Sequence, residues 1–287
     1  MQKTNKPEGW DITIQSDSSW FELNLAEVWK YRDLIIMFIK RDFIAQYKQT
    51  ILGPLWFFLQ PLITTLTYIV VFGKIANLSS DGQPRVLFYL SGILFWNYFS
   101  TSFIRTSETF SANAGIFGKV YFPRLTVPLA TVCSALLSFA IQLLLFSIVY
   151  IYEVVVHGYH SEWHGLIFIL PLLIIIMAAL ALGTGIIISS LTIRYRDLKY
   201  LVTFGIQLLM FATPVVYPVS AVKNPTLSTL LQLNPMTAII ETFRYAILGS
   251  GDFSWPLLGY AAGMSFVILI IGIVLFNRVE KTFMDTI

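Results

Sequence analysis

Long apolar runs separated by short polar segments make up most of the chain from residue 55 onward. A helix needs about 20 predominantly apolar residues to cross a hydrocarbon core about 30 Å thick. Six runs meet this requirement, and they cover residues 55–76, 86–106, 125–152, 166–191, 198–217 and 255–276. The pattern predicts an all-α integral membrane protein with six transmembrane helices, of which the third is long enough to tilt or to extend past the bilayer.

Two other apolar segments do not fit the pattern of a span, and the first covers residues 24–48. Its apolar positions recur at helical spacing, with Lys30, Arg41 and Lys48 on the other side. We expect an amphipathic helix in the cytoplasmic membrane interface, because its cations then reach lipid headgroups. An ordinary helix packed against the bundle is the alternative. The polar residues 1–23 lack an apolar run and predict a cytoplasmic segment rather than a signal peptide.

The second segment, 219–249, lies between the fifth and sixth predicted spans. Its two apolar stretches are interrupted by Pro225 and by Asn234-Pro235, and neither is long enough to cross a bilayer. Non-helical backbone at membrane depth is tolerated only where protein or a water-filled cavity surrounds it. We therefore expect a re-entrant helical hairpin that enters from the outer face. Residues 49–287 then form one membrane domain.

The distribution of cations predicts the orientation. Most of the 19 Lys and Arg residues precede the first predicted span or follow the second, the fourth or the sixth. Cations resist translocation and stay in the cytoplasm, so both termini are predicted to be cytoplasmic. The exceptions are Lys74, Arg85, Lys223 and Arg244, and Lys74 can extend its ammonium to the interface from a helix end.

Composition agrees with a membrane protein. The chain has 287 residues, of which 56% are hydrophobic and 12% charged, with a mean hydropathy of +0.71. These values lie outside the range of soluble globular domains. A formal net charge of +3 gives no indication of nucleic-acid binding. Cys133 is the single cysteine, so an intrachain disulfide is excluded.

Enzyme motifs are absent from the sequence. It has no phosphate-binding Gly-x-x-x-x-Gly-Lys-Ser/Thr loop, His-Glu-x-x-His, Cys-x-x-Cys or Gly-x-Ser-x-Gly. We therefore expect a chain that does not hydrolyse ATP itself. His157, His160, Glu162 and His164 lie close together after the third span, but such spacing specifies a metal site only weakly. We favour a solvated loop anchored by Trp163 over a metal site.

Two ionisable residues of the expected hairpin, Glu241 and Arg244, are three positions apart and can pair on one helix face. If the pair lies at membrane depth, it faces a cavity or a partner and has a functional role. If the hairpin lies at the surface, the pair is a solvated salt bridge, and the sequence leaves both interpretations open.

Small residues in two spans permit close helix approach. They are Gly183 and Gly185 in the fourth span and the Gly-x-x-x-Gly of Gly259 and Gly263 in the sixth. We favour packing within the chain over a subunit interface for these glycines.

Aromatic residues make up 15% of the chain and are frequent in the first two spans. Aromatic faces can stack on sugar rings, which suits a channel for a repeating polymer. Interfacial anchoring and ordinary packing are the alternative uses of such side chains. The candidate channel-lining residues are Trp56, Phe57, Tyr68, Tyr89, Trp96 and Tyr98.

Several strings together resemble the permease subunits of type 2 ABC exporters of polysaccharide, the O-antigen, capsule and teichoic-acid group. The resemblance covers the chain from about residue 20 onward. The matching strings are residues 40–62, 113–129 and 194–200, together with Asn234-Pro235-Met236 and Arg244.

The resemblance implies a homodimer bound to two copies of a separate ATPase subunit, which binds ATP and Mg. Residues 113–124 correspond to the coupling helix that docks on the ATPase. The residues expected in this contact are Asn113, Phe117, Lys119, Tyr121, Phe122, Pro123 and Arg124. The resemblance also implies a channel between protomers, lined by the first, second and fifth spans. The hairpins, with Pro235, Glu241 and Arg244, would close it on the outside.

The substrate implied by the resemblance is a glycan on a polyprenyl diphosphate lipid, moved across the bacterial cytoplasmic (inner) membrane. Lys40, Arg41 and Lys48 form a cationic group that can meet the anionic headgroup. A membrane-embedded glycosyltransferase or polymerase would need carboxylates near the membrane plane, and the spans contain almost none. A secondary transporter would show internal repeats. An exporter of a small lipid or drug with the same fold stays open.

Overall fold

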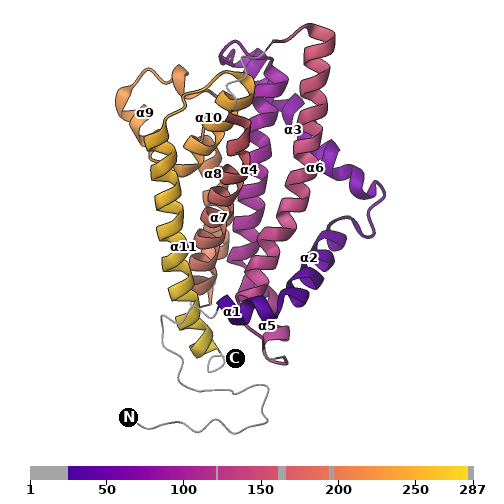
Figure 1. The fold of residues 1–287 in the computed structure, drawn as a ribbon, viewed down its shortest axis with the longest axis vertical. Coiled ribbons are helices and arrows are strands. Elements are labelled where there is room, and N and C mark those ends of the chain that lie inside the picture. The colour runs from indigo at the N-terminus through magenta and orange to yellow at the C-terminus, as the bar shows by residue number, and fades with distance from the viewer. Residues whose placement is uncertain (1–24, 121, 161–165, 194, 196, 284–287) are drawn as a thin grey trace.

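The structure is a computed structural model that describes residues 25–120, 122–160, 166–193, 195 and 197–283 (Figure 1). Within these ranges every regular element is helical. Four long helices run side by side along the long axis of the molecule. They are α4 (Arg85–Ser107), α6 (Thr126–His157), α7 (Leu170–Thr192) and α11 (Trp255–Phe283), and the short η3 (Leu166–Ile169) precedes α7. The all-α prediction is confirmed.

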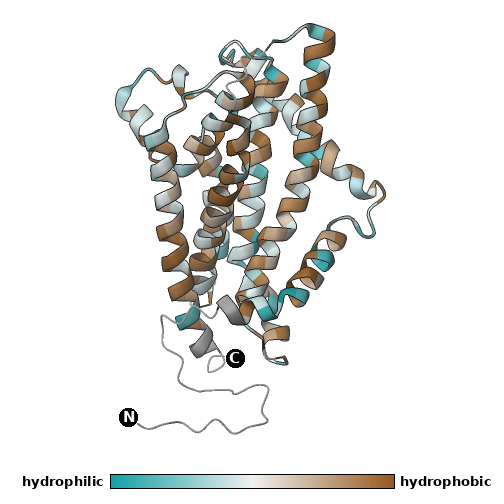
Figure 2. Cartoon of the chain, in the orientation of Figure 1, coloured by the Kyte–Doolittle hydropathy of each residue, from teal (hydrophilic) through white to brown (hydrophobic). Residues whose placement is uncertain are grey.

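Four described segments are long and apolar enough to cross a membrane. They are Gly53–Ile75, Thr126–His157, Leu170–Thr192 and Trp255–Val279. The first consists of η1 (Gly53–Leu55), α3 (Trp56–Tyr68) and the π-helix η2 (Ile69–Ile75). Figure 2 shows hydrophobic residues along the length of α6, α7 and α11. These four segments correspond to the first, third, fourth and sixth predicted spans.

The second and fifth predicted spans differ from the others. α4 has 23 residues, but Asn97, several Ser and Thr residues and Arg105 lower its hydropathy, and most of its side chains are buried in the bundle. α8 (Leu198–Phe211) has 14 residues and ends two residues before Thr213. Because Pro214 disfavours the α conformation at the residue before it, the fifth run cannot continue as one helix to residue 217.

Glycine backbones let α7 approach its neighbours closely. A Cβ on Gly183 would lie 2.7 Å from the backbone of Leu269 in α11, and one on Gly185 would lie 2.6 Å from Cβ of Thr106 in α4. The packing interpretation of Gly183 and Gly185 is confirmed. Around Gly259 and Gly263 no described atom lies within 4 Å of such a Cβ, so these two glycines do not pack within the chain.

The first described helices, α1 (Leu25–Lys30) and α2 (Arg32–Tyr47), lie at one end of the bundle, where the C-terminal end of α11 also lies (Figure 1). α2 packs against α6, and Oγ of Ser138 donates a hydrogen bond to Oε1 of Gln46 at 3.3 Å. Its outer side mixes exposed apolar residues with exposed cations (Figure 2). The predicted helix is thus present as two pieces, and α2 contacts the bundle.

The segment between α8 and α11 contains η4 (Val219–Ala221), α9 (Pro225–Gln232) and α10 (Pro235–Leu248). α9 and α10 correspond to the two apolar stretches that the sequence predicts between residues 219 and 249. They lie at the end of the bundle opposite α1 (Figure 1). α10 packs among the long helices, since the ring of Phe243 lies 4.6 Å from that of Phe95 and 5.4 Å from that of Phe146.

Candidate functional site

α10 is a buried helix with clear boundaries. Oδ1 of Asn234 accepts a hydrogen bond from the backbone N–H of Met236 at 3.0 Å, and Pro235 occupies the first turn. Both features favour a helix start at this point. Gly249, with φ of +71°, ends the helix in the left-handed region. Every α10 side chain except that of Tyr245 is buried, so the helix is embedded in the bundle.

Arg244 is the most connected polar residue of α10, and only 1% of it is exposed. Its Nη1 donates to the backbone oxygen of Pro214 at 2.6 Å, and its Nη2 donates to those of Val215 at 3.0 Å and Phe88 at 3.2 Å. Nε donates to Oγ of Ser91 at 3.2 Å, and the guanidinium lies 3.8 Å from the centre of the Phe88 ring. One side chain therefore joins α10, α4 and the turn after α8.

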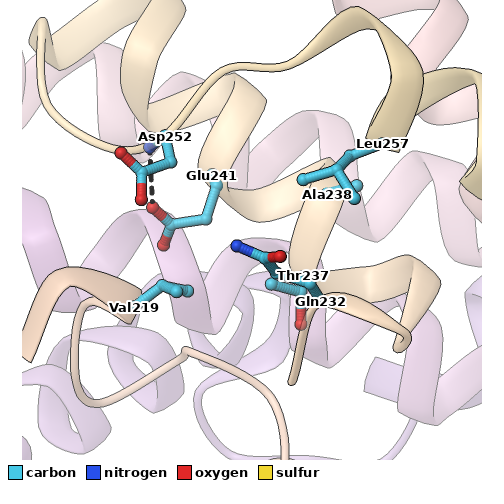
Figure 3. A pocket seen from close by; sticks show the side chains of 7 residues that line it. All are labelled: Val219, Gln232, Thr237, Ala238, Glu241, Asp252 and Leu257. Atoms are coloured by element: carbon cyan, nitrogen blue, oxygen red, sulfur yellow. Dashed lines mark hydrogen bonds between the residues drawn. The ribbon is translucent and has the colours of Figure 1, made fainter. Parts of the chain in front are cut away.

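Glu241 balances this buried charge. Its Oε1 accepts from Nη1 of Arg244 at 3.1 Å, and its Oε2 accepts from the backbone N–H of Asp252 at 3.2 Å (Figure 3). A buried charge is tolerated when it is paired and hydrogen-bonded, and removing one partner costs about 3–5 kcal/mol. Both side chains are buried, so the pair is not the solvated salt bridge of the second interpretation, and its functional role stays a prediction.

A small recess adjoins Glu241. Val219, Gln232, Thr237, Ala238, Asp252 and Leu257 complete its lining (Figure 3). It has room for about one water molecule. The carboxylate thus borders a gap between the start of η4, the end of α9 and the turn before α11.

Two glycines shape the surroundings of the Glu241–Arg244 pair. A Cβ on Gly92 would lie 2.7 Å from the backbone oxygen of Val215 and 2.9 Å from Nη2 of Arg244. Gly251 has φ of +103°, and a Cβ there would lie 2.9 Å from Oε2 of Glu241. We call the assembly of Ser91, Gly92, Pro214, Val215, Glu241 and Arg244 the arginine lock. The sequence predicted only the pairing of Glu241 with Arg244. Pro214 could have indicated the turn that brings backbone oxygens to Arg244.

Side-chain hydrogen bonds connect the loops around the arginine lock. The hydroxyl of Tyr159 donates to the backbone oxygen of Leu248 at 2.9 Å and contacts the side-chain amide of Gln83. Burial raises the pKa of Tyr159 to about 12, so this hydroxyl keeps its proton at neutral pH. Nδ2 of Asn234 donates to Oγ1 of Thr213 at 2.8 Å. These contacts hold both ends of α10.

The predicted coupling segment, 113–124, lies at the other end of the bundle (Figure 1). Its helix, α5, covers Thr109–Phe117, and Nδ2 of Asn113 donates to the backbone oxygen of Thr109 at 2.9 Å. Residues 118–120 and 122–125 follow as turns, with Pro123 half-buried, and Tyr121 lies outside the described residues. The helix therefore starts and ends before the limits expected from the sequence.

The aromatic residues of this segment face the bundle. Phe117 and Phe122 are buried, with ring centres 5.8 Å apart, and Phe122 also contacts Phe38 of α2 at 6.0 Å. Arg124 is buried with its guanidinium 5.6 Å from the Phe117 ring. Phe117 and Phe122 therefore pack within the chain, and their predicted contact with a partner stays a prediction. Lys119 is exposed.

The candidate channel-lining residues divide into buried and exposed sets. Tyr89, Trp96 and Tyr98 are buried within the chain, and a covered ring cannot stack on a polymer that passes outside the chain. Their predicted role in lining a channel stays a prediction. Trp56 is exposed, Phe57 stacks on Phe43 at 5.3 Å, and the hydroxyl of Tyr68 donates to Sδ of Met210 at 3.3 Å.

The cationic group near α2 lies on the surface. Lys40, Arg41 and Lys48 are all exposed. Nη2 of Arg41 lies 2.8 Å from Oδ1 of Asp42, so part of its charge is balanced within the chain. Among the described residues, no group of three His, Cys, Asp or Glu side chains could hold a metal ion. Glu162 and His164 of the histidine loop lie outside the described residues.

Four described helical segments that are long and apolar enough to cross a bilayer indicate a helical membrane protein. The profile of the ABC-2 type transporter family matches residues 33–248, which is most of the chain. The chain belongs to this family.

The curated relatives align over most of their length. An O-antigen export system permease protein, RfbA, of Myxococcus xanthus is 29% identical over 221 residues, covering 77% of this chain and 82% of the relative. RfbA of Klebsiella pneumoniae is 27% identical over 254 residues, covering 88% and 94%. The polysialic acid transport protein KpsM of Escherichia coli is 23% identical over 248 residues, covering 86% and 93%.

Proposed function

We propose that this chain is the channel-forming permease subunit of an ATP-driven exporter that moves lipid-linked polysaccharide across the bacterial cytoplasmic membrane. The observation that carries the proposal is the combination of the family match over residues 33–248 with relatives that are named as polysaccharide transporters and align over most of their length. The helical fold and the apolar spans agree with it.

The proposed topology has six crossings, made by α3 with η2, α4, α6, α7, α8 and α11. α2 lies in the cytoplasmic interface, and α9 with α10 forms the re-entrant outer hairpin. Fourteen helical residues extend about 21 Å, so α8 needs the turn at 212–218 to complete its crossing. Both termini are cytoplasmic, which agrees with α1 and the end of α11 lying at one end of the bundle.

The proposed partner is a separate ATPase subunit in two copies, bound to a homodimer of this chain. The ATPase supplies the sites for ATP and Mg, and this chain binds no cofactor. The contact would use the exposed Lys119 with the exposed apolar Ile116 and Val120, which are close in sequence to the buried Phe117 and Phe122. An exposed apolar surface with a flanking cation is a suitable docking surface for another protein.

The proposed channel lies between the two copies of the chain. The exposed sides of α3 and α8 would line it, with Trp56 and Leu66 on α3 and Tyr200, Phe204 and Leu208 on α8. The exposed Lys40, Arg41 and Lys48 would receive the diphosphate of the polyprenyl-linked glycan. These cations belong to α2 and the residue after it, and α2 starts near the end of the bundle where α5 lies (Figure 1).

Export in cells tests the proposal. The gene is deleted in its own host and restored on a plasmid, with the adjacent ATPase, and surface polysaccharide and intracellular lipid-linked glycan are quantified. We expect deletion to abolish surface polysaccharide, with glycan accumulating inside, and the plasmid to restore export. Normal surface polysaccharide in the deletion strain would overturn the proposal. If the plasmid instead restored export of a small lipid or drug, with surface polysaccharide unchanged, the chain would be a permease for that small molecule.

A further inference from the structure

The chain passes from α4 into α5 beside α7. α4 ends at Ser107, Glu108 forms a turn, and α5 begins at Thr109. We call residues 106–110 the junction. Within the described residues, the side chain of Glu108 makes no hydrogen bond that caps α5. The first N–H groups of a helix have no partner inside that helix, so a neighbouring element can fix where α5 starts.

Ser189 of α7 supplies a partner of this kind. Its Oγ accepts a hydrogen bond from the backbone N–H of Phe110 at 3.3 Å, and both residues are buried. A side-chain oxygen that accepts from the second or third N–H of a helix is the usual N-cap, and it normally belongs to the residue before the helix. Here the hydroxyl comes from another helix, so the bond joins α5 to α7.

Two further contacts join α7 to the junction. Oγ1 of Thr192 donates to the backbone oxygen of Ser107 at 3.4 Å. A Cβ on Gly185 would lie 2.6 Å from Cβ of Thr106, so the two helices touch at this glycine. Residues three and four apart lie on the same side of a helix. One side of α7, with Gly185, Ser189 and Thr192, therefore holds the end of α4 and the start of α5.

The ring of Phe110 attaches the junction to α11 as well. It stacks on the ring of Phe276 with the ring centres 4.6 Å apart, and both side chains are buried. α7 and α11 also approach closely, since a Cβ on Gly272 would lie 2.7 Å from the backbone oxygen of Gly183. Interiors packed this closely have low compressibility and transmit strain. The junction, α7 and α11 therefore form one packed unit.

The rest of α5 has an exposed side. Thr109 and Phe110 are buried, whereas the side chains that follow include several exposed ones, which are Ser111, Ala112, Gly115 and Ile116. α5 thus combines a surface that a partner can reach with a start that is fixed inside the bundle. A force applied to the exposed side reaches α7 and α11 through the junction.

Resting on the ATPase contact proposed above, we propose that Ser189 is a positioning residue for energy coupling. Its hydroxyl keeps the start of α5 in place on α7. When the ATPase displaces the exposed side of α5, α7 and α11 then move together with it. Without the hydroxyl, the start of α5 shifts on α7 and part of the displacement is lost. ATP hydrolysis continues, but each ATP moves less polysaccharide.

Two matched pairs of variants test this role in the full complex with the ATPase. Ser189→Ala removes the hydroxyl that joins the helices, and its control is Ser190→Ala. Ser190 is also buried in α7, but its hydroxyl donates to the oxygen of Ile186 in the same helix at 2.8 Å. Thr192→Val removes the second contact, and its control is Thr184→Val, because Thr184 donates to the oxygen of Leu180 within α7 at 2.6 Å.

The measured quantity is the amount of polysaccharide moved per ATP hydrolysed. Each complex is purified and reconstituted into proteoliposomes with the lipid-linked polysaccharide of the host, and both rates are measured in the same sample. A misfolded fraction lowers both rates in proportion and leaves their ratio unchanged. A purely structural role of Ser189 therefore does not change the ratio, whereas a positioning role does.

We expect Ser189→Ala to lower the ratio at least threefold and Thr192→Val to lower it less, because the bond made by Thr192 is longer. Both controls should stay within twofold of the wild type. Equal ratios in Ser189→Ala and Ser190→Ala would overturn the inference. A wild-type complex that hydrolyses ATP but moves no polysaccharide would indicate failure of the proposed function instead, so the two failures are separable.

Discussion

The two ends of the bundle each bury an arginine beside a phenylalanine ring, but they hold it differently. Arg244 lies 3.8 Å from the ring of Phe88 and donates to a carboxylate, a hydroxyl and three backbone oxygens. Arg124 lies 5.6 Å from the ring of Phe117, within a cluster of aromatic rings around α5. A buried ion pair with its hydrogen bonds therefore characterises the first end, and a cluster of packed apolar rings characterises the second.

The difference predicts how each end responds to change. Directional bonds to backbone oxygens specify one arrangement and fail together when their donor is removed. Apolar packing accepts a side chain of similar volume at small cost. We infer that α10 is held in one position and that the end with α5 can adjust its surface against a partner.

The largest effect is expected from Arg244→Met, because it leaves the buried Glu241 carboxylate without its cationic partner and removes the guanidinium donor from the backbone oxygens of Pro214 and Val215. We expect the free energy of unfolding to fall by about 3–5 kcal/mol. Thermal unfolding of the detergent-purified protein measures this change. The control is the double variant Glu241→Gln/Arg244→Met, which removes both charges and should recover part of the loss. A single variant as stable as the wild type would contradict the arginine lock.

The arginine lock also shows where sequence reasoning reached its limit. Long apolar runs identified the long helices because a hydrocarbon solvent demands them, and the spacing of Glu241 and Arg244 identified their pairing. The partners of Arg244 in the turn are backbone oxygens, which every residue type carries, so no pattern could locate them. The role of Gly92 was not predicted, because a glycine in an apolar helix does not indicate which atoms pack against its backbone.

The burial of the aromatic residues could not be predicted for a similar reason. A phenylalanine can be exposed at a docking surface or buried in a core, and only the packing of Phe122 against Phe38 and of Phe117 against Phe110 shows that both are buried. Likewise, the aromatic residues of α4 were predicted to line a channel because aromatic faces can stack on sugar rings. The structure shows that neighbouring helices cover α4 on most sides, which a single sequence cannot show.

A smaller effect is expected from Phe117→Leu, which tests the packed end of the comparison. The ring lies among Phe110, Phe122 and Arg124, and leucine keeps most of its apolar volume. We expect the free energy of unfolding to fall by about 1–1.5 kcal/mol and export to be retained. Thermal unfolding in detergent measures the first and surface polysaccharide the second. A loss as large as that of Arg244→Met would mean that both ends depend on specific geometry.

The smallest effect on stability is expected from Lys119→Glu, since this side chain is exposed beside α5. Surface substitutions of this kind change stability by about 0.5 kcal/mol or less. If the α5 end contacts the ATPase, reversing the charge should still lower polysaccharide-dependent ATP hydrolysis severalfold in the reconstituted complex. Lys223→Glu is the matched control, because it makes the same change on an exposed lysine at the opposite end. Equal ATPase activity in the two variants would place the coupling contact elsewhere, whereas a loss confined to Lys119→Glu would assign energy coupling to the end with α5.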